Sequence, residues 1–223
     1  MRTQTKETQA SLTPQEVVTI LTEGNKRFTS NLKANRDLLQ QVKETSKGQH
    51  PYAIVLSCID SRTSSELVFD LGMGDIFNAR IAGNIVNEDI LGSMEFACKV
   101  AGSKLIVVLG HTKCGAVKGA CDHVELGNLT GLVKKIEPAV NAVETDGARN
   151  SSNAEFVEKV AVENVYRAIN EIQEKSPILK EMIENGEIGI IGGMYDVETG
   201  NVEFYHHTFN QKGAANEELA GKH

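Results

Sequence analysis

The sequence lacks several features that would assign a protein to a class at once. It has no tryptophan, only 4 cysteines among 223 residues, and no apolar run near the roughly 18 residues that a membrane-spanning helix needs. The opening segment MRTQTKETQASL also lacks the apolar core of a secretory signal. We therefore expect a cytoplasmic protein, or a periplasmic one if a leader has been removed.

A basic surface is also missing. Lysine and arginine number 23 against 30 aspartates and glutamates, which gives a net charge of −7 and a sequence pI near 5.4. Nucleic acids and anionic membranes bind basic faces. The charge balance therefore argues against both as main partners and favours a small-molecule substrate.

The cysteines are too few for a disulfide scaffold in a chain of 223 residues. All of them lie between residues 58 and 121, which fits thiols that are kept reduced. Metal binding or catalysis then becomes the question to ask of each cysteine.

Short apolar runs alternate with amphipathic stretches from residue 53 onward, and no linker divides the chain into two domains. The runs predict strands at 53–57, 75–80, 104–110 and 187–195. Helices are predicted around 64–71, 88–100, 155–174 and 176–186, and the turn at 196–200 leads into a last strand at 201–206. This order predicts an α/β fold with a mostly parallel central sheet, helices on both faces and an antiparallel edge strand near the C-terminus.

The N-terminal part reads as a helical arm. Thr13 is placed to cap a helix, Pro14 takes the first helical position, and Glu16 completes a capping box. Residues 29–50 are polar and cannot bury much surface alone. We expect the arm to lie against a partner subunit.

Chemically unusual residues follow two of the predicted strands. Cys58, Asp60 and Arg62 come after the first strand, and His111 and Cys114 come after the third. Ligands bind beyond the carboxyl ends of the strands in open parallel sheets, so both groups point into one region. Two thiolates and an imidazole suit zinc with a free fourth position, which is the pattern of catalytic sites. The residues alone leave open whether another side chain supplies the third ligand.

The remaining cysteines and histidines have plainer interpretations. Cys98 fits a buried, inert thiol on an amphipathic helix, and Cys121 stands about 10 Å from Cys114 if the segment between them is helical, too far to share a metal. Surface positions are favoured for three histidines, His123, His206 and His207. GHTKCGAV lacks the Lys and Ser/Thr of a phosphate-binding loop, and no C-x-x-C redox motif is present.

Asp60 and Arg62 have two interpretations. They could form a plain surface ion pair, worth about 0–1 kcal/mol. Beside a metal, however, a carboxylate held bidentate by a guanidinium would have a lowered pKa and a second oxygen facing the site.

With these residues in place, the chain resembles the β-class carbonic anhydrases. The resemblance is carried by CIDSR, by GHTKCG about fifty residues later, and by DLGMGDIFNARIAGN between them. It covers 49–121 by motif and the rest by element order. The pairing of C-x-D-x-R with H-x-x-C is far more specific than either half.

The resemblance implies a role for each matching residue. Cys58, His111 and Cys114 match the zinc ligands of the family, and Asp60 and Arg62 match its catalytic pair. It also implies one Zn²⁺ per chain in a single zinc-dependent α/β catalytic domain. We expect that domain to cover 13–210, with the arm at 13–45 and flexible tails at 1–12 and 211–223.

The resemblance further implies a small substrate pocket. Gln49 falls where some members place a glutamine that donates to substrate or bicarbonate. Phe77, Ala82 and Phe96 fall at positions that line the pocket, and Gly115 follows the last ligand.

The chain departs from the family at two places. The usual R-N-x-G-N reads Arg80-Ile81-Ala82-Gly83-Asn84, so the first asparagine is replaced. One subclass binds a regulatory bicarbonate through Trp, Arg and Tyr, and Arg80 matches that arginine. Val55 and Phe96 stand where the aromatic donors are expected, so we do not expect this regulation.

The expected activity is reversible hydration of carbon dioxide to bicarbonate and a proton by zinc-bound hydroxide. The alternatives are hydrolysis of carbonyl sulfide or carbon disulfide on the same scaffold, or a non-catalytic zinc-binding protein in which Asp60 closes the site. The expected partners are the small-molecule substrate and further copies of the chain, as a homodimer or homotetramer.

Overall fold

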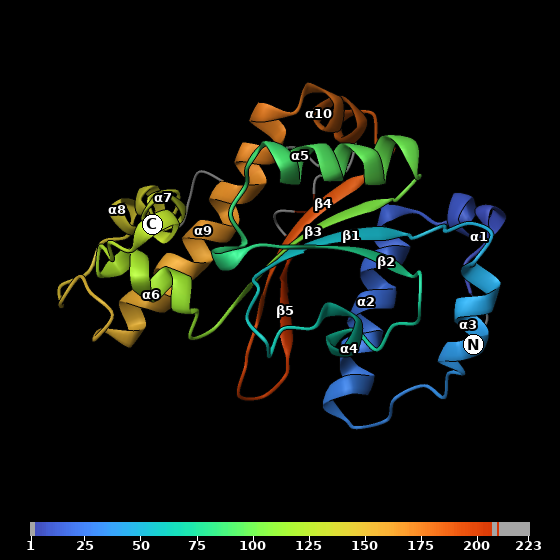
Figure 1. Cartoon of the computed structure of the whole chain (residues 1–223), viewed down its shortest axis with the longest axis horizontal. Coiled ribbons are helices and arrows are strands. Elements are labelled where there is room, and N and C mark those ends of the chain that lie inside the picture. The colour runs from blue at the N-terminus through green and yellow to red at the C-terminus, as the bar shows by residue number, and fades with distance from the viewer. Residues whose placement is uncertain (1–2, 207–208, 210–223) are drawn as a thin grey trace.

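A central sheet organises the chain (Figure 1). The computed structural model describes residues 3–206 and residue 209. Its 5 strands run in the order β2-β1-β3-β4-β5, and they cover β1 (Ala53–Ser57), β2 (Ile76–Arg80), β3 (Leu105–His111), β4 (Gly189–Tyr195) and β5 (Val202–Tyr205). All neighbours pair in parallel except β4 and β5, which are antiparallel. The predicted α/β fold is confirmed.

Helices cover both faces of this sheet and extend past its end. They are α1 (Lys6–Ser11), α2 (Pro14–Thr29), α3 (Leu38–Thr45), α4 (Ser65–Val68), the 3₁₀ turn η1 (Ala82–Asn84), α5 (Glu88–Glu95), the π-helical turn η2 (Phe96–Val100), α6 (Gly115–Cys121), α7 (Gly127–Val133), α8 (Glu137–Ala142), α9 (Ala154–Lys175) and α10 (Pro177–Glu184). None of the described helices combines the length and apolar character needed to cross a membrane.

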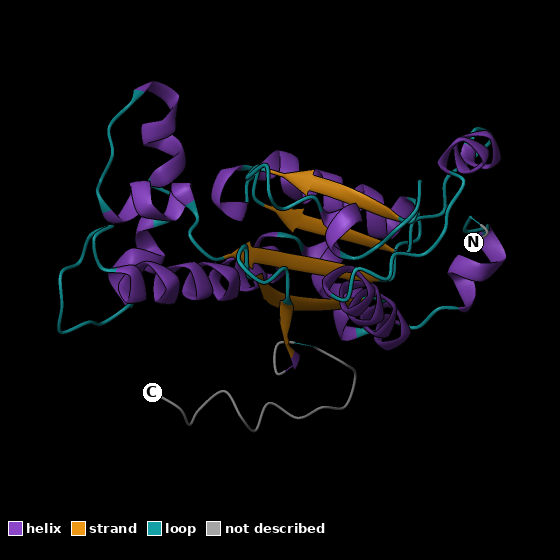
Figure 2. Cartoon of the chain, turned by 90° about the horizontal axis from the view of Figure 1, so that it is seen from below, coloured by secondary structure: helices purple, strands orange, loops and turns teal. Residues whose placement is uncertain are grey.

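The alternation of side chains along β1 explains how the layers form. Ala53 and Val55 pack toward α2 and α4, whereas Ile54 and Leu56 pack toward α5, α9 and α10. Every residue of β1 is buried, as expected for a parallel strand covered on both faces. Besides these two clusters on the faces of the sheet, a third hydrophobic core lies under α6, α8 and the first turns of α9. This part of the chain extends beyond the carboxyl ends of the parallel strands (Figure 2).

The extreme N-terminus differs from the flexible tail that we predicted over 1–12. Residues 6–11 form α1, which Thr5 and Thr8 cap reciprocally. Gln9 is buried and donates hydrogen bonds to the carbonyl oxygens of Pro51 (2.7 Å) and Ala101 (2.8 Å). One buried amide therefore anchors a segment whose polar composition suggested a loose end.

The arm over 13–45 also differs from the prediction. The capping box of Thr13 and Glu16 is present, as predicted. However, α2 buries Val17 and Leu21 against this chain's own sheet, so this helix does not depend on a partner subunit for its apolar face. At Gly24 the helix passes so close to α4 that an added Cβ would lie 1.9 Å from the Phe69 carbonyl oxygen.

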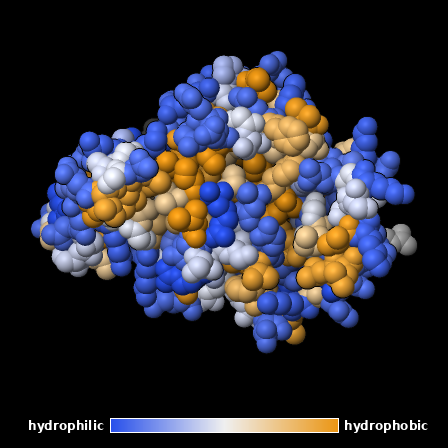
Figure 3. Space-filling model, in the orientation of Figure 1, coloured by the Kyte–Doolittle hydropathy of each residue, from blue (hydrophilic) through white to orange (hydrophobic). Residues whose placement is uncertain are grey.

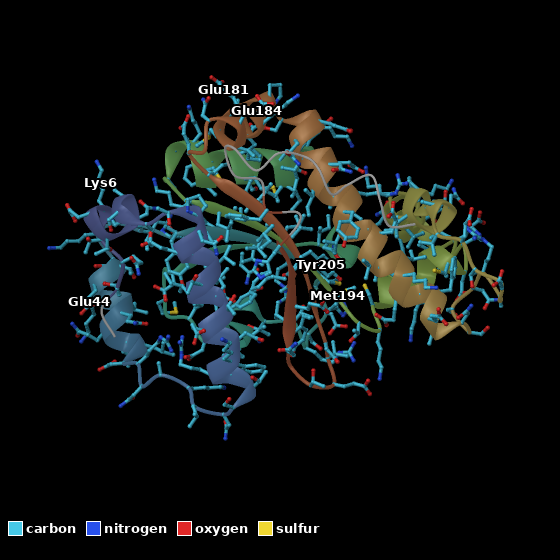
Figure 4. The ribbon with its side chains drawn as sticks, turned by 180° about the vertical axis from the view of Figure 1, so that it is seen from behind. Lys6, Glu44, Glu181, Glu184, Met194 and Tyr205 are labelled. Atoms are coloured by element: carbon cyan, nitrogen blue, oxygen red, sulfur yellow. The ribbon has the colours of Figure 1, made fainter. Side chains whose placement is uncertain are left out.

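The second half of the arm lies apart from the sheet. Helix α3 sits beside α1, and Thr3 donates a hydrogen bond of 2.9 Å to Glu44. Lys6 of α1 and Glu44 of α3 project from the same end of the molecule (Figure 4). Unlike α2, helix α3 of the predicted arm leaves large apolar side chains exposed.

Two other regions were predicted incompletely. Only Ser65–Val68 is helical within the helix predicted at 64–71, because Asp70 adopts a left-handed conformation with φ of 46°. Residues 115–142 form the short helices α6, α7 and α8, none of which we predicted as a separate element. The predicted helix at 88–100 is present and ends in the π-helical turn.

A buried carboxylate fixes the connection between α2 and α3. The Asp70 side chain is 4% exposed and pairs with Arg27 Nε and Arg36 Nη1, each at 2.6 Å. It also accepts from the backbone N–H of Ala34 at 3.1 Å. Burial alone would raise the pKa of Asp70, but these hydrogen bonds outweigh it and the pKa is lowered.

We predict that Asp70→Asn lowers the free energy of unfolding by about 3 kcal/mol, because it removes the buried negative charge that Arg27 and Arg36 both pair with. Because the pKa of Asp70 is lower in the folded state than in the unfolded state, its ionised form stabilises the protein at pH values above the unfolded-state pKa of about 3.9. This stabilisation is lost as the pH falls through the folded-state pKa. The free energy of unfolding, measured with denaturant, should therefore fall more in the parent than in the variant when the pH is lowered below about 4. Glu23→Gln is the control, since Glu23 forms an exposed pair with Lys26, and equal losses in the two variants would contradict this role.

Candidate metal centre

Three predicted ligands come together at the carboxyl end of the sheet. Cys58 follows β1, His111 ends β3, and Cys114 immediately precedes α6. Their candidate ligand atoms lie within 4.8 Å of one another, and the two sulfur atoms are 4.0 Å apart. The residues are only 4%, 2% and 1% exposed, respectively.

The chemistry of this cluster suits a divalent metal ion. His111 Nδ1 lies 2.9 Å from the Thr112 carbonyl oxygen, an arrangement that places the proton on Nδ1 and leaves Nε2 as a ligand. Nε2 is buried without a hydrogen-bond partner. A tetrahedral zinc with bonds near 2.3 Å sets two sulfurs about 3.8 Å apart, close to the observed separation.

The charge state of the two thiols points the same way. The Cys114 thiol and the backbone N–H of Gly83, 3.3 Å from the Cys58 sulfur, help to lower the pKa of Cys58 to about 4. The pairing with Cys58, together with burial, raises the pKa of Cys114. A second buried thiolate so close to the first therefore needs a cation between them.

Asp60 and Arg62 form the bidentate pair that the sequence suggested. Arg62 Nε donates to Asp60 Oδ1 at 2.9 Å and Nη2 donates to Oδ2 at 2.7 Å. The Arg62 guanidinium holds the pKa of the Asp60 carboxyl well below its usual range. Asp60 Oδ2 lies 3.9 Å from His111 Nε2, so the carboxylate stands beside the cluster with Arg62 holding it.

A family model described as "Carbonic anhydrase" matches residues 53–202. The chain belongs to the carbonic anhydrase family. Among curated relatives, carbonic anhydrase 2 of Mycobacterium tuberculosis is 32% identical over 196 residues, which cover 85% of this chain and 92% of the relative.

Solved structures of β-carbonic anhydrases share the fold. The β-carbonic anhydrase CcaA superimposes with a TM-score of 0.67 at 24% identity and covers 88% of this chain and 91% of its own. One of two β-carbonic anhydrases from Sordaria macrospora, described as tetrameric, has a TM-score of 0.66 at 20% identity and covers 85% and 97% of the respective chains. The predicted resemblance to the β class is confirmed, and zinc, the cofactor of that class, suits the cluster.

Two of the five predicted substrate-binding residues lie next to the metal centre of this carbonic anhydrase. Ala82 precedes Gly83, whose N–H contacts the Cys58 sulfur. Gly115 directly follows Cys114, and an added Cβ at Gly115 would meet no atom within 4 Å. Their roles in binding substrate stay predictions.

The other three lie away from the centre within the same chain. Phe77 pairs with Ile54, which is four residues before Cys58, or roughly 13 Å along the strands. Phe77 and Phe96 meet edge to face, with ring centroids 6.0 Å apart, and line a groove of about 680 Å³ between β2 and α5. Gln49 is exposed and precedes β1, at the opposite end of that strand from Cys58.

Arg80 is a site residue whose role the sequence alone did not reveal. Its Nε donates to the Cys58 carbonyl oxygen at 3.0 Å, and its Nη2 donates to the Asp60 carbonyl oxygen at 2.6 Å. The guanidinium thus holds the backbone that carries the first candidate ligand, Cys58, and the carboxylate of the predicted catalytic pair, Asp60. A signal was present, because Arg80 ends the predicted strand that pairs with β1 and lies opposite Ser57.

The other cysteines and histidines that the structure describes lie outside the cluster. Burial raises the pKa of Cys98 to about 12 and that of Cys121 to about 11, as expected for inert thiols. His123 and His206 are exposed, as predicted, and His207 lies outside the described residues.

We predict that the purified chain holds one zinc ion and that Cys58→Ala removes it, because two remaining ligands cannot hold a catalytic zinc tightly. Metal analysis after dialysis against a weak chelator measures this. Cys98→Ala and Cys121→Ala are matched controls that delete a buried thiol elsewhere and should keep the metal. Undiminished zinc in Cys58→Ala would contradict the assignment.

Proposed function

We propose that the chain catalyses the reversible hydration of carbon dioxide to bicarbonate and a proton, with one zinc ion held by Cys58, His111 and Cys114. The observation that carries this proposal is the buried three-ligand cluster with the Asp60–Arg62 pair beside it. Family membership supports it, because the relatives found are named carbonic anhydrases. A hydration assay with and without a zinc chelator tests it, and turnover that survives complete zinc removal would contradict it.

The residues of this chain supply position and charge for the reaction. When bound, zinc lowers the pKa of a water molecule and so supplies a nucleophile for carbon dioxide near neutral pH. Asp60 Oδ2 lies 3.9 Å from His111 Nε2, where it would accept a hydrogen bond from the nucleophile and so align it. Because the pKa of Asp60 is so low, this carboxylate orients the proton but does not store it, and the proton leaves to solvent.

The alternatives are less favoured. A closed, non-catalytic zinc site needs Asp60 as the fourth ligand, but Arg62 engages both of its oxygens and the cluster consists of the other three residues. A hydrolase for carbonyl sulfide or carbon disulfide would use the same metal ligands. The names of the relatives favour carbon dioxide over these analogues.

A homodimer or homotetramer is part of the proposal. Helix α3 exposes Leu38 (51%), Leu39 (76%) and Val42 (47%), and Met73 beside them is also exposed. Apolar side chains gather on this side of the molecule in Figure 3, near the place of α3 and α4 in Figure 1. The tetrameric description of a neighbour with the same fold supports assembly.

Assembly would also explain the distant substrate-binding residues. Gln49, Phe77 and Phe96 cannot reach the metal centre of their own chain, and β2 is an edge strand of the sheet. If they line a substrate pocket, a second copy must bring them to it. A cytoplasmic location completes the proposal, since all four cysteines are free thiols.

We predict that Arg62→Ala keeps its zinc but loses activity by about 100-fold, because the unanchored Asp60 no longer holds its position beside the metal. Arg62→Lys keeps the positive charge but cannot form the bidentate hydrogen bonds to Asp60, so it should recover only part of the lost activity. Initial rates of hydration, paired with zinc content, measure this. Full activity in Arg62→Ala would show that the pair is not catalytic.

We predict that Leu39→Glu shifts the assembly toward monomer, because it places a charge within the apolar surface of α3. Sedimentation velocity over a concentration series measures the shift. Leu126→Glu is the matched control, since Leu126 is 67% exposed and precedes α7 at the far end of the molecule (Figure 1). An unchanged mass distribution in Leu39→Glu would exclude α3 from the interface.

A further inference from the structure

The loop between β3 and α6 must satisfy a tight geometric requirement. Only Thr112 and Lys113 separate the metal-binding residues His111 and Cys114. Within these two residues the chain turns from a strand into a helix, and Lys113 adopts a left-handed conformation with φ of 56°. Non-glycine residues rarely take this conformation unless surrounding contacts hold it.

The structure shows how each residue of the loop is held. Thr112 is tied to the hairpin of β4 and β5: its N–H donates to the Tyr195 carbonyl oxygen at 2.9 Å, and its hydroxyl accepts from the Val197 N–H at 3.0 Å. The N–H of Lys113, the residue with the left-handed backbone, donates to Glu158 Oε1 at 2.8 Å. Glu158 therefore contacts the loop at its most constrained position.

Helix α9 gives Glu158 a rigid base. Phe156, Val157 and Val160, which surround it in sequence, are at most 1% exposed and belong to the core that also contains Cys58 and Cys114. The helix backbone that carries Glu158 is thus fixed relative to both cysteine ligands.

The second contact of Lys113 is a weaker restraint. Its Nζ lies 2.6 Å from Glu198 Oε1, but the two side chains are 48% and 67% exposed. Exposed pairs of this kind contribute little, and this one acts at the end of a flexible side chain. It does not constrain the backbone between the ligands.

We propose that Glu158 is a positioning residue for the metal centre. By accepting from the Lys113 N–H, it holds residue 113 in the left-handed conformation and so sets the separation of His111 Nε2 and Cys114 Sγ. This inference rests on the proposed zinc site. It assigns to a residue 44 positions after Cys114 a part in binding the metal.

Two conservative substitutions separate position from charge. Glu158→Gln keeps the length of the side chain and an acceptor oxygen but removes the charge. Glu158→Asp keeps the charge but withdraws the acceptor by one methylene. A positioning role predicts parent-like behaviour in Glu158→Gln and a defect in Glu158→Asp, whereas a purely electrostatic role predicts the reverse.

The experiment measures the zinc dissociation constant of each full-length variant by competition with a chromophoric chelator. We expect Glu158→Ala to raise the constant about 10-fold or more, as losses of outer-shell contacts to metal ligands do. Glu158→Asp should show a smaller increase and Glu158→Gln almost none. The absorption spectrum of the cobalt-substituted protein, which reports ligand geometry, should change in the same order.

Glu155→Gln is the matched control, because Glu155 lies on the same helix and pairs with Lys159 at 2.7 Å without touching the loop. It should leave the constant unchanged. Parent-like affinity in Glu158→Ala, or a defect in Glu158→Gln that exceeds the one in Glu158→Asp, would overturn the proposal. If Glu158→Ala does not fold, the comparison of Asp with Gln decides, and a parent chain that binds no zinc would instead overturn the proposed function.

Discussion

The parallel pairing of β1 with β3 is the constraint on which the metal centre depends. Its register sets Ser57 opposite Leu109, the last paired residues of the two strands. Cys58 and His111 follow this pair by one and two residues, so both lie at the carboxyl ends of the strands. Both strands are buried on both faces. A slip of one residue would turn each side chain of a strand to the opposite face, so the packing of the two cores also fixes the relative positions of the ligands.

Local sequence patterns predicted the parts of this structure that depend on local interactions. The buried strands, the capping box of α2 and the Asp60–Arg62 pair each involve residues that are close in sequence. The three-residue metal cluster was also predictable, although Cys58 and Cys114 lie 56 residues apart, because the carboxyl ends of parallel strands converge.

The parts that escaped prediction depend on contacts between distant segments. Gln9 anchors α1 through carbonyl groups 42 and 92 residues away, and nothing in its neighbourhood marks it as buried. Helices α6, α7 and α8 have at most seven residues each, so their apolar periodicity is too brief to detect. Glu158 and Arg80 act on backbone groups, which leave no signature in the identity of the residues they contact.

The guanidinium of Arg80 links the edge of the sheet to the first metal ligand. Arg80 is the last residue of β2, the edge strand, and it grips the carbonyl oxygens of Cys58 and Asp60. These hydrogen bonds couple the position of β2 to the backbone of Cys58 and Asp60, so a displacement of β2 would also move the first candidate metal ligand. The last residue of the edge strand thus joins the outer side of the sheet to the backbone of a candidate metal ligand.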